Sequence, residues 1–520
     1  MAILVLAVAA LAGAPSPPAR ASENLLSFMM DDDLLVFSTY GTREFTMRYM
    51  KSSGADGVRV TVPWKFVAGE AGRRPPAAQT GARAENPRSY RADIWDRFDD
   101  IARLGQILDM TVLFNVTGPG PVWAHPRAPF ANRFDQPAWR PNVAAFRRFV
   151  KAVGRRYSGT WRDENQDRAI LPRVRLWSIW NEVNQPASLA PQLAYDRRVR
   201  KQVPQAPIMY RDLYYAASGA LRSVGHADSL LMMGETAPLG GFTPRIRLWP
   251  KQFIRELFCL RPNLRPYTGL EARVRRCDVL RRNGRFHVSA WAHHPYTQRN
   301  PPTVRDRFAN SINMANIGDL PRLLDLVAAR TGLIPRNLPV GLTEAGWETM
   351  PPDPTRGVSL GAQAEYLNRA QRLAYDQPRV FMETQFILRD VHPRARYRGR
   401  RDRLSQYWAT WQSGLIFADG RPKPAYTAYL VPFDRRPGGG ANLRFWGQVR
   451  FLAPFAEQDV YLQFRPAGSP HWRVEAGPIP VRGALGFWEH AAPSPGPGVW
   501  RVALLHREVP FVSREISVTG

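Results

Sequence analysis

From about residue 30 to residue 433, short apolar runs alternate with segments whose apolar residues recur at helical spacing. The runs indicate buried strands, and stripes such as Ile94, Phe98 and Ile101 indicate helices with one buried face. The pattern predicts eight strands, at residues 33–37, 57–64, 108–115, 175–182, 230–235, 287–296, 338–344 and 379–388. This alternation predicts an α/β fold, a (β/α)8 TIM barrel. An open doubly wound sheet is the alternative, disfavoured because no strand is followed by a Gly-rich turn.

The pattern changes after residue 433. Residues 435–440 resemble a linker, and the chain then carries short alternating strands at 443–449, 460–464, 499–505 and 511–518, separated by Pro and Gly turns. This predicts a small antiparallel β-sandwich at 441–520, following a barrel at 30–433. The sandwich is interpreted either as a carbohydrate-binding module or as a structural cap on the barrel.

The first residues indicate export. Residues 2–14 are apolar and small, and Ala19-Arg-Ala21 fits a cleavage site, so residues 1–21 are predicted to be a signal peptide. The protein is therefore expected to be secreted or bound at the cell surface, with no integral membrane segment after cleavage. Only Cys259 and Cys277 occur; in an exported chain they indicate one disulfide, with two buried free thiols as the alternative.

The formal net charge is +28, and most basic residues are arginines. One interpretation is an acidic partner such as a uronic-acid polysaccharide or an anionic cell wall; the other is arginine spread over a solvated surface. No long basic run or nucleic-acid motif occurs, so no nucleic-acid partner is expected. The densest basic segment, residues 394–403, indicates a charged loop.

Candidate chemistry lies where two predicted strands end. The fourth strand ends in Trp180-Asn181-Glu182, and the seventh ends in Thr343-Glu344. The carboxyl ends of barrel strands meet at one mouth, where catalytic groups of such barrels lie. Two carboxyl groups facing each other are the arrangement that cleavage of a glycosidic bond needs.

These motifs resemble those of the clan A retaining glycoside hydrolases. Asn181-Glu182 is similar to their Asn-Glu signature, which implies Glu182 as acid/base, and Thr343-Glu344 is similar to their nucleophile strand. His294-Pro-Tyr296 resembles the His-x-Tyr of strand six, where the Tyr hydroxyl contacts the nucleophile. Residues 58–64 resemble the second strand of cellulase-type members, where an Arg, here Arg59, supports the nucleophile electrostatically. The resemblance covers about residues 30 to 433, with the motifs in strand order.

The resemblance also implies supporting roles. Asn181 would hold the sugar 2-hydroxyl, and His294 would hydrogen-bond beside it. Asn115 ends the third strand, where cellulase-type members carry a His-Asn pair. The eighth strand lacks the Trp that commonly floors the first sugar subsite, with Gln385 or Phe386 in that region instead. The remaining candidates, for sugar stacking or for core packing, are Trp64, Trp123, Trp291 and Trp347.

Other chemistries find little support in the sequence. Further acidic candidates are Asp212, Glu235 and Glu348, of which Glu235 ends the fifth strand. No Cys/His cluster has zinc spacing, no Gly-rich phosphate loop precedes a helix, and no Gly-x-Ser-x-Gly elbow occurs. We therefore expect neither a metal nor a cofactor.

The leading hypothesis is an exported retaining glycoside hydrolase that cleaves an oligo- or polysaccharide by double displacement with two Glu. Its partner would be a carbohydrate, with an acidic polysaccharide as a sub-hypothesis. The rival is a catalytically silent carbohydrate-binding barrel attached to cell-wall or capsular glycan, motivated by the missing Trp of strand eight. A nucleic-acid-binding protein, suggested by charge alone, is the most distant alternative.

Overall fold

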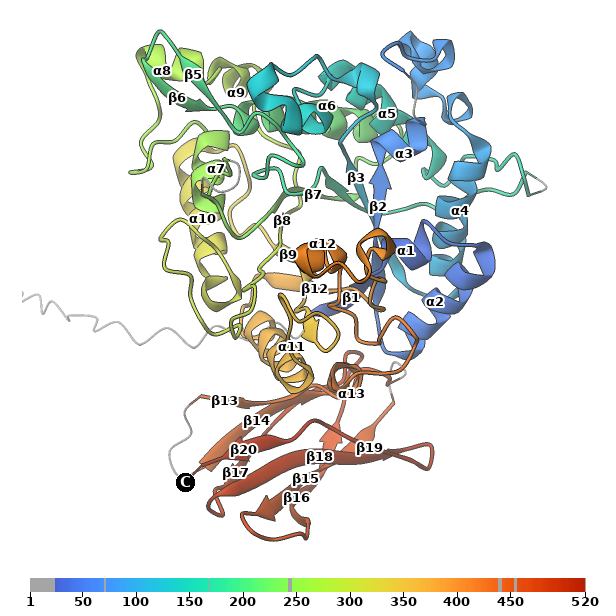
Figure 1. Ribbon diagram of the computed structural model, residues 1–520, viewed down its shortest axis with the longest axis vertical. Helices are drawn as coiled ribbons and strands as arrows, with labels where there is room; N and C mark the ends of the chain where they lie inside the picture. The colour runs from blue at the N-terminus through green and yellow to red at the C-terminus, as the bar shows by residue number, and fades with distance from the viewer. Residues whose placement is uncertain are drawn as a thin grey trace, which may run out of the picture.

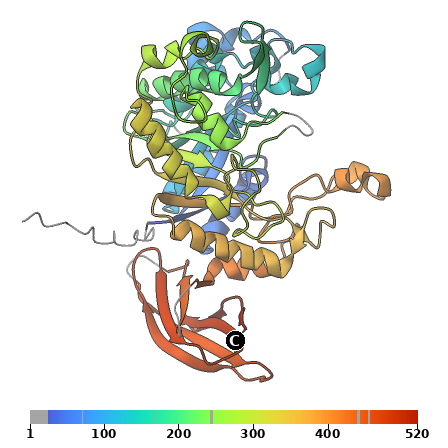
Figure 2. The ribbon, with the colours of Figure 1, turned by 90° about the vertical axis from the view of Figure 1, so that its left-hand side faces the viewer.

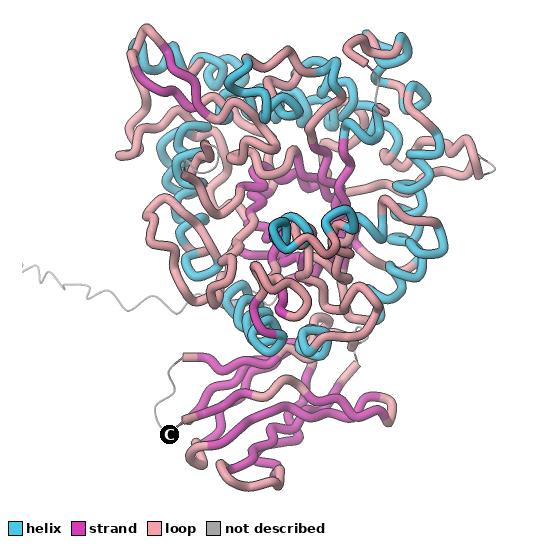
Figure 3. Tube along the Cα trace, viewed as in Figure 1, coloured by secondary structure: helices cyan, strands magenta, loops and turns pink. Residues whose placement is uncertain are grey.

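The computed structural model describes residues 24–69, 72–166, 168–241, 246–437, 442–452 and 456–519. Eight parallel strands close a barrel in the order β1-β12-β9-β8-β7-β4-β3-β2. Figure 3 shows the strands as a ring with the helices outside it. The predicted TIM barrel is confirmed. The barrel strands are β1 (Leu26–Met30), β2 (Gly57–Pro63), β3 (Thr111–Thr117), β4 (Leu176–Ile179), β7 (Leu230–Thr236), β8 (Ala290–His293), β9 (Val340–Ala345) and β12 (Val380–Phe386).

Amphipathic helices cover the outside of the barrel. The long ones are α2 (Tyr40–Ser52), α4 (Ala92–Ile107), α5 (Val143–Arg156), α6 (Ala206–Arg222), α10 (Asp319–Thr331) and α11 (Leu360–Tyr375). Shorter helices are α1 (Asp32–Leu35), α3 (Trp64–Ala68), α7 (Pro250–Leu257), α8 (Gly269–Val274), α9 (Asp278–Asn283), α12 (Leu404–Tyr407) and α13 (Pro424–Leu430). Two short pairs, β5 (Leu193–Asp196) with β6 (Lys201–Pro204) and β10 (Thr349–Met350) with β11 (Val358–Ser359), lie in the loops after β4 and β9.

The prediction of a first strand at residues 33–37 is wrong. Residues Asp32–Leu35 form α1, because the Asp31 side chain accepts a hydrogen bond from the Leu34 amide and the next two residues are acidic. Negative side chains stabilise the first turn of a helix, where amide groups point outward. The true first strand, β1, lies just before this helix and closes the barrel between β12 and β2.

A layer of apolar side chains fills the inside of the barrel below the site. Its buried members are Phe28, Leu113, Leu176, Met232, Ala290, Ala292 and Met382. Bulky side chains from five strands and the two alanines of β8 fill this layer, so the barrel is a packed core and not a pore. The polar residues that follow in the same strands therefore lie at the carboxyl end of the barrel, above this layer.

The long excursion between β7 and β8 carries the disulfide. Cys259 and Cys277 are bonded, with an S–S distance of 2.00 Å and a Cα–Cα distance of 5.9 Å. The bond joins the end of α7 to the segment before α9, and both cysteines are buried. The predicted pairing is confirmed, and the alternative of two free thiols is excluded.

The C-terminal part is formed by two antiparallel sheets. One contains β13 (Phe433–Arg436), β14 (Asn442–Gln448) and β17 (Phe487–Pro493). The other contains β15 (Gln458–Pro466), β16 (Arg473–Val481), β18 (Gly498–His506), β19 (Val509–Val512) and β20 (Ile516–Val518). Phe445 of the first sheet packs on Trp500 of the second, with ring centroids 4.8 Å apart. Arg435 and Arg436, expected in a linker, belong to β13, and residues 438–440 lie outside the described residues.

Buried charges join these sheets to the barrel. Arg450, after β14, pairs with Glu383 of β12 at 2.9 Å, and both side chains are almost fully covered. Asp434 of β13 accepts hydrogen bonds from Arg372 of α11 at 2.7 Å and from Arg514 at 2.8 Å. Figures 1 and 2 place the sheets below α11 and α13, beside the barrel and away from its opening. Such a contact is what a structural cap requires; the role of the sandwich in binding glycan stays a prediction.

The predicted signal peptide, residues 1–21, lies outside the described residues. Among the helices of the described part, none combines the length and the apolar character that a membrane span needs.

Candidate active site

The two predicted glutamates face each other across a cavity at the carboxyl ends of the strands. Glu344 is the fifth residue of β9, and Glu182 follows β4. A carboxylate oxygen of each lies within 4.8 Å of the other. The cavity has a volume of ≈ 710 Å³ and is lined from seven of the eight strand ends or the loops that follow them. Its lining includes Met30, Asp32, Asn181, Tyr296, Arg299, Glu348, Arg356, Phe386 and Trp411.

Three polar groups surround the Glu344 carboxylate. Arg59 lies 3.2 Å from Oε1, the Tyr296 hydroxyl donates to Oε2 at 3.0 Å, and His294 lies 3.5 Å from Oε2. Burial raises the pKa of Glu344, the positive charges of His294 and Arg59 oppose this, and the charge of Glu182 adds to it. The pKa of Tyr296 is raised well above its usual value by burial and by Glu344, so its hydroxyl remains a donor. Arg59 and His294 thus favour the ionised form of Glu344, but they do not fully offset burial, and its pKa stays above the usual value.

His294 lies between the two glutamates. Its Nδ1 is 3.3 Å from Oε1 of Glu182, and its Nε2 is 3.7 Å from Oε2 of Glu235. Burial alone would lower the pKa of His294, but the charges of Glu344, Glu182 and Glu235 raise it to about 10. The ring is therefore an imidazolium at neutral pH and can donate from both nitrogens.

Glu235 is the buried counter-charge of this cluster. Its side chain is fully covered; Oε2 pairs with Arg59 at 2.6 Å, and Oε1 accepts a hydrogen bond from Ser178 at 2.6 Å. Burial raises the pKa of Glu235, but Arg59 and His294 outweigh this and lower it to about 2. The sequence marked Glu235 only as a further acid at the end of a strand. Its position beside Arg59 depends on the closure of the barrel, which no local pattern encodes.

Three residues at the site have left-handed backbone conformations, which residues other than glycine rarely adopt. Trp180, Glu182 and Glu235 have φ of 69°, 41° and 49°. Such residues cost free energy and persist where the surrounding structure fixes them. The Asn115 amide donates to the Trp180 carbonyl at 2.7 Å, which helps to hold this turn. Asn115 is fully buried and does not line the cavity, so it supports the turn and makes no direct contact with the cavity.

The Trp residues expected as stacking candidates are not at the cavity. Trp64, Trp291 and Trp347 are buried, Trp123 is half-buried against Trp64, and none of them lines the cavity. Trp64 and Trp347, proposed as site residues, belong to the core: Trp64 packs on Phe146 and Phe149, and the Trp347 ring donates to Thr297 at 3.1 Å. Their burial corrects the stacking interpretation.

Two other aromatic residues line the cavity instead. Phe386 ends β12, and Trp411 packs edge-on against it with ring centroids 5.3 Å apart. Trp411 is 51% exposed and belongs to the long loop after β12. It supplies an aromatic surface in the region where strand eight lacks a Trp. Sequence reasoning missed Trp411 because it lies 25 positions after the strand end at Phe386.

The remaining acids have separate surroundings. Asp212 of α6 pairs with Arg276 at 2.6 Å and does not line the cavity. Glu348 lines the cavity, pairs with Arg356 at 3.2 Å, and has its pKa raised to about 7, mainly by burial. In the described part of the chain, Glu182, His294 and Glu344 are the group spaced closely enough for a metal ion.

The fold and the site can be placed beside known proteins. No protein-family model matches the sequence, and no curated protein matches it either. The protein is a (β/α)8 barrel, and several solved structures share this fold.

Three solved structures illustrate this similarity. A family 39 glycoside hydrolase from Bacteroides cellulosilyticus has a TM-score of 0.48 and 15% identity, covering 91% of this chain and 81% of that one. The GH5_18 protein of Streptomyces cattleya, in complex with GlcNAc, has a TM-score of 0.44 and 16% identity, covering 79% of each chain. The hyperthermophilic β-glucosidase of Pyrococcus furiosus has a TM-score of 0.45 and 13% identity, covering 79% and 95%.

The buried cluster gives a prediction on stability. Glu235→Gln is expected to lower the free energy of unfolding by about 3 kcal/mol at neutral pH, because Arg59 and His294 lose a buried counter-charge. The pKa of Glu235 falls from 4.5 to about 2 on folding, so its contribution is present above pH 4.5 and is lost as the pH falls toward 2. The difference from wild type should therefore shrink below pH 4.5, as urea unfolding at neutral and acidic pH would measure.

Glu365→Gln is the matched control. Glu365 pairs with Arg369 one helical turn away and its side chain is 41% exposed, so this change is expected to cost less than about 0.5 kcal/mol. Equal losses for the two variants, or a loss at Glu235 that does not change with pH, would contradict the assigned role of the buried cluster.

Proposed function

We propose that the protein is a retaining glycoside hydrolase that cleaves O-glycosidic bonds with Glu182 as acid/base and Glu344 as nucleophile. The observation that carries the proposal is the pair of carboxylates within 4.8 Å of each other at the barrel mouth. Retaining enzymes hold their carboxyl groups about 5–5.5 Å apart, whereas inverting enzymes need about 6.5–9.5 Å to admit a water molecule. The spacing here therefore supports double displacement.

In the first step, Glu344 attacks the anomeric carbon and Glu182 gives its proton to the leaving oxygen. The bond from carbon to the leaving group breaks, and a covalent bond from the sugar to Glu344 forms. Tyr296 and Arg59 contact the attacking carboxylate and hold it in position. Asn181 accepts a hydrogen bond from Arg59 at 3.0 Å, which leaves its amide nitrogen for the sugar 2-hydroxyl.

In the second step, water replaces the leaving group. Glu182, now ionised, takes a proton from the water, which attacks the anomeric carbon and releases Glu344. The side chain of Glu182 is 29% exposed and that of Glu344 is 12% exposed, so Glu182 is the more open to incoming water, which suits a group that exchanges protons with it. The product keeps the configuration of the substrate.

The charges of the cluster fit these roles. Glu182, Glu235 and Glu344 contribute three negative charges when ionised, and Arg59 and His294 contribute two positive charges. A general acid beside a nucleophile requires one protonated and one ionised carboxyl group, and a single added proton balances the charges of these five groups.

Export is a further part of the proposal. The Cys259–Cys277 disulfide supports it, because such bonds persist in oxidising compartments. A carbohydrate outside the cell would then be the substrate.

The direct test is the stereochemistry of hydrolysis. Wild-type protein is incubated with a panel of aryl glycosides, and NMR follows the anomeric configuration of the first sugar released. Retention is expected for each substrate that turns over. Inversion would contradict the roles of Glu182 and Glu344, and binding of glycans without turnover of any of them would favour the silent carbohydrate-binding barrel.

A further inference from the structure

The loop after β12 forms a projecting arm beside the cavity, here called the strand-eight arm (residues 389–412). It contains short helical turns at Ala395–Tyr397 and Arg401–Arg403, followed by α12. Figure 1 places α12 over the barrel opening, and Figure 2 shows the orange arm extending away from the barrel. The arm is therefore positioned to contact any long molecule that enters the cavity.

Buried interactions fix the two ends of the arm. Lys423 donates to Asp390, near its start, at 2.8 Å and to the carbonyl of Gln412, at its end, at 3.0 Å. Both ionised side chains of this pair are almost fully buried. The Val391 amide donates to the Trp411 carbonyl at 2.8 Å, so the two chain segments are joined directly. The base of the arm is thus a built structure, and Trp411 carries it to the cavity lining.

Arg356 joins the arm to the cavity from the other side. Its guanidinium donates to the carbonyls of Trp408 at 2.7 Å and Thr410 at 3.1 Å, and it also lines the cavity. Arg299 lines the cavity as well, and its side chain forms no hydrogen bond or ion pair with any residue that the structure describes. Positive charge therefore continues from the cavity wall to the arm.

The arm carries a dense group of exposed arginines. Six of the ten residues from 394 to 403 are arginine, all of them exposed: Arg394, Arg396, Arg398, Arg400, Arg401 and Arg403. The one acid in this segment, Asp402, pairs with Arg403 at 3.1 Å. The other five arginines form no ion pair with a described residue. A folded surface that gathers unpaired guanidinium groups attracts anions, and guanidinium binds carboxylate and sulfate groups in a planar, two-point manner.

We propose that the strand-eight arm is a cationic subsite for a polyanionic glycan, a chain that bears carboxylate or sulfate groups. The chain would lie along the arm while one of its sugars occupies the cavity beside Trp411; this step rests on the proposed function of that cavity. A glycan is favoured over a nucleic acid because Trp411, Glu182 and Glu344 line one continuous cavity with the arm at its edge. Charge on the arm would then select the substrate, whereas the cavity would cleave it.

The test uses binding, so that it does not depend on turnover. In the full-length Glu344→Gln protein, calorimetry measures the affinity for heparin, polygalacturonate, neutral arabinoxylan and duplex DNA. The arm variant replaces Arg396, Arg398, Arg400 and Arg401 with Gln. We expect its Kd for heparin or polygalacturonate to rise about tenfold at low salt, with a weaker dependence on ionic strength. Polygalacturonate bears carboxylates alone, whereas heparin bears sulfates as well as carboxylates. A response to polygalacturonate therefore shows that carboxylate suffices, and a response to heparin alone shows that sulfate is required.

The matched control replaces four exposed arginines at the opposite end of the barrel: Arg281, Arg285, Arg330 and Arg336. These arginines lie in the segments that precede β8 and β9, and replacing them removes the same net charge as the arm variant does. The affinity of this control for the anionic glycans is expected to stay near that of the parent protein. Equal effects of the two variants would show that only net charge matters and would overturn the proposal. So would an unchanged Kd in the arm variant, or arm-dependent binding of DNA that is tighter than that of either glycan.

The failure of this subsite and that of the proposed function can be distinguished. If wild-type protein hydrolyses neutral glycosides with retention while the arm variant binds anionic glycans unchanged, the proposed function stands and the subsite is wrong. If the arm binds anionic glycan but wild-type protein cleaves none, the subsite stands and the proposed hydrolysis is wrong.

Discussion

Glu344→Ala is expected to reduce kcat/KM by at least about 10⁴-fold, which corresponds to roughly 5 kcal/mol of transition-state stabilisation. The loss should be this large because Glu344 is the carboxylate that lies within 4.8 Å of both Glu182 and His294 at the cavity. Arg59, Tyr296 and His294 all contact Glu344, so they lose their common partner at the same time. Steady-state kinetics on an activated aryl glycoside measure the effect.

Azide distinguishes a missing nucleophile from a damaged fold. In Glu344→Ala the removed carboxylate leaves space at the anomeric carbon, and azide in that space should restore part of the rate and yield a glycosyl azide of inverted configuration. Glu348→Gln is a matched control, because Glu348 also lines the cavity but pairs with Arg356 and lies outside the cluster around His294. Activity of Glu344→Ala near that of wild type, or loss without rescue and with native stability, would contradict the nucleophile assignment.

The barrel and the central pair of residues could be predicted from sequence because their signals are local. A buried strand is a short apolar run, and a catalytic group at its end is a polar residue just beyond that run, as at Glu182 and Glu344. The motifs also follow one another in strand order, which is the order expected if the strands close into a barrel. The eight pairings that close it then follow from strand order alone.

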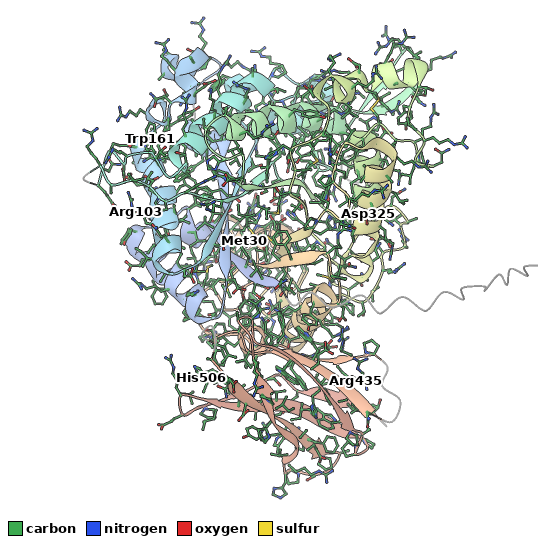
Figure 4. The ribbon with its side chains drawn as sticks, turned by 180° about the vertical axis from the view of Figure 1, so that it is seen from behind. Met30, Arg103, Trp161, Asp325, Arg435 and His506 are labelled. Carbon is green, nitrogen blue, oxygen red and sulfur yellow. A yellow bond between two sulfur atoms is a disulfide. The ribbon has the colours of Figure 1, made fainter. Side chains whose placement is uncertain are left out.

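Other features depend on contacts between distant segments. The first strand was missed because an apolar run and a helix N-terminus adjoin at Met30 and Asp31, and side-chain capping decides between them. Figure 4, which views the protein from behind, shows Met30 near the middle of the barrel, where its sulfur lies 3.2 Å from the Arg59 guanidinium. Arg59 and Glu235 are 176 residues apart, so their ion pair exists only once the barrel has closed.

The aromatic positions show the same limit. A Trp that follows a strand can be packed or exposed, and local sequence does not distinguish these outcomes. Trp64 and Trp347 lie near strand ends yet are buried, whereas Trp411 lies in a loop and lines the cavity. Trp411 is held at the cavity because buried interactions of Asp390 and Lys423 fix the ends of the strand-eight arm.

Glu182→Ala is expected to show a loss that depends on the leaving group. For an aryl glycoside with a poor leaving group, kcat/KM should fall about 10²–10⁴-fold, because the leaving oxygen receives no proton. For a strongly activated leaving group, kcat/KM should change much less, since departure needs no acid. The covalent intermediate would then accumulate, because no base activates the water. Burst kinetics and mass spectrometry of the sugar-bound protein measure this difference.

The pH dependence of Glu182→Ala follows from the neighbouring charges. The alkaline fall of kcat/KM should disappear for activated substrates, because the group whose deprotonation caused it has been removed. The charge of Glu182 raises the pKa of Glu344, so its removal should lower that pKa and shift the acidic limb to lower pH. Azide should attack the intermediate and give a glycosyl azide of retained configuration, opposite to the product of Glu344→Ala. If both variants gave the same configuration, the two roles assigned across the cavity would be wrong.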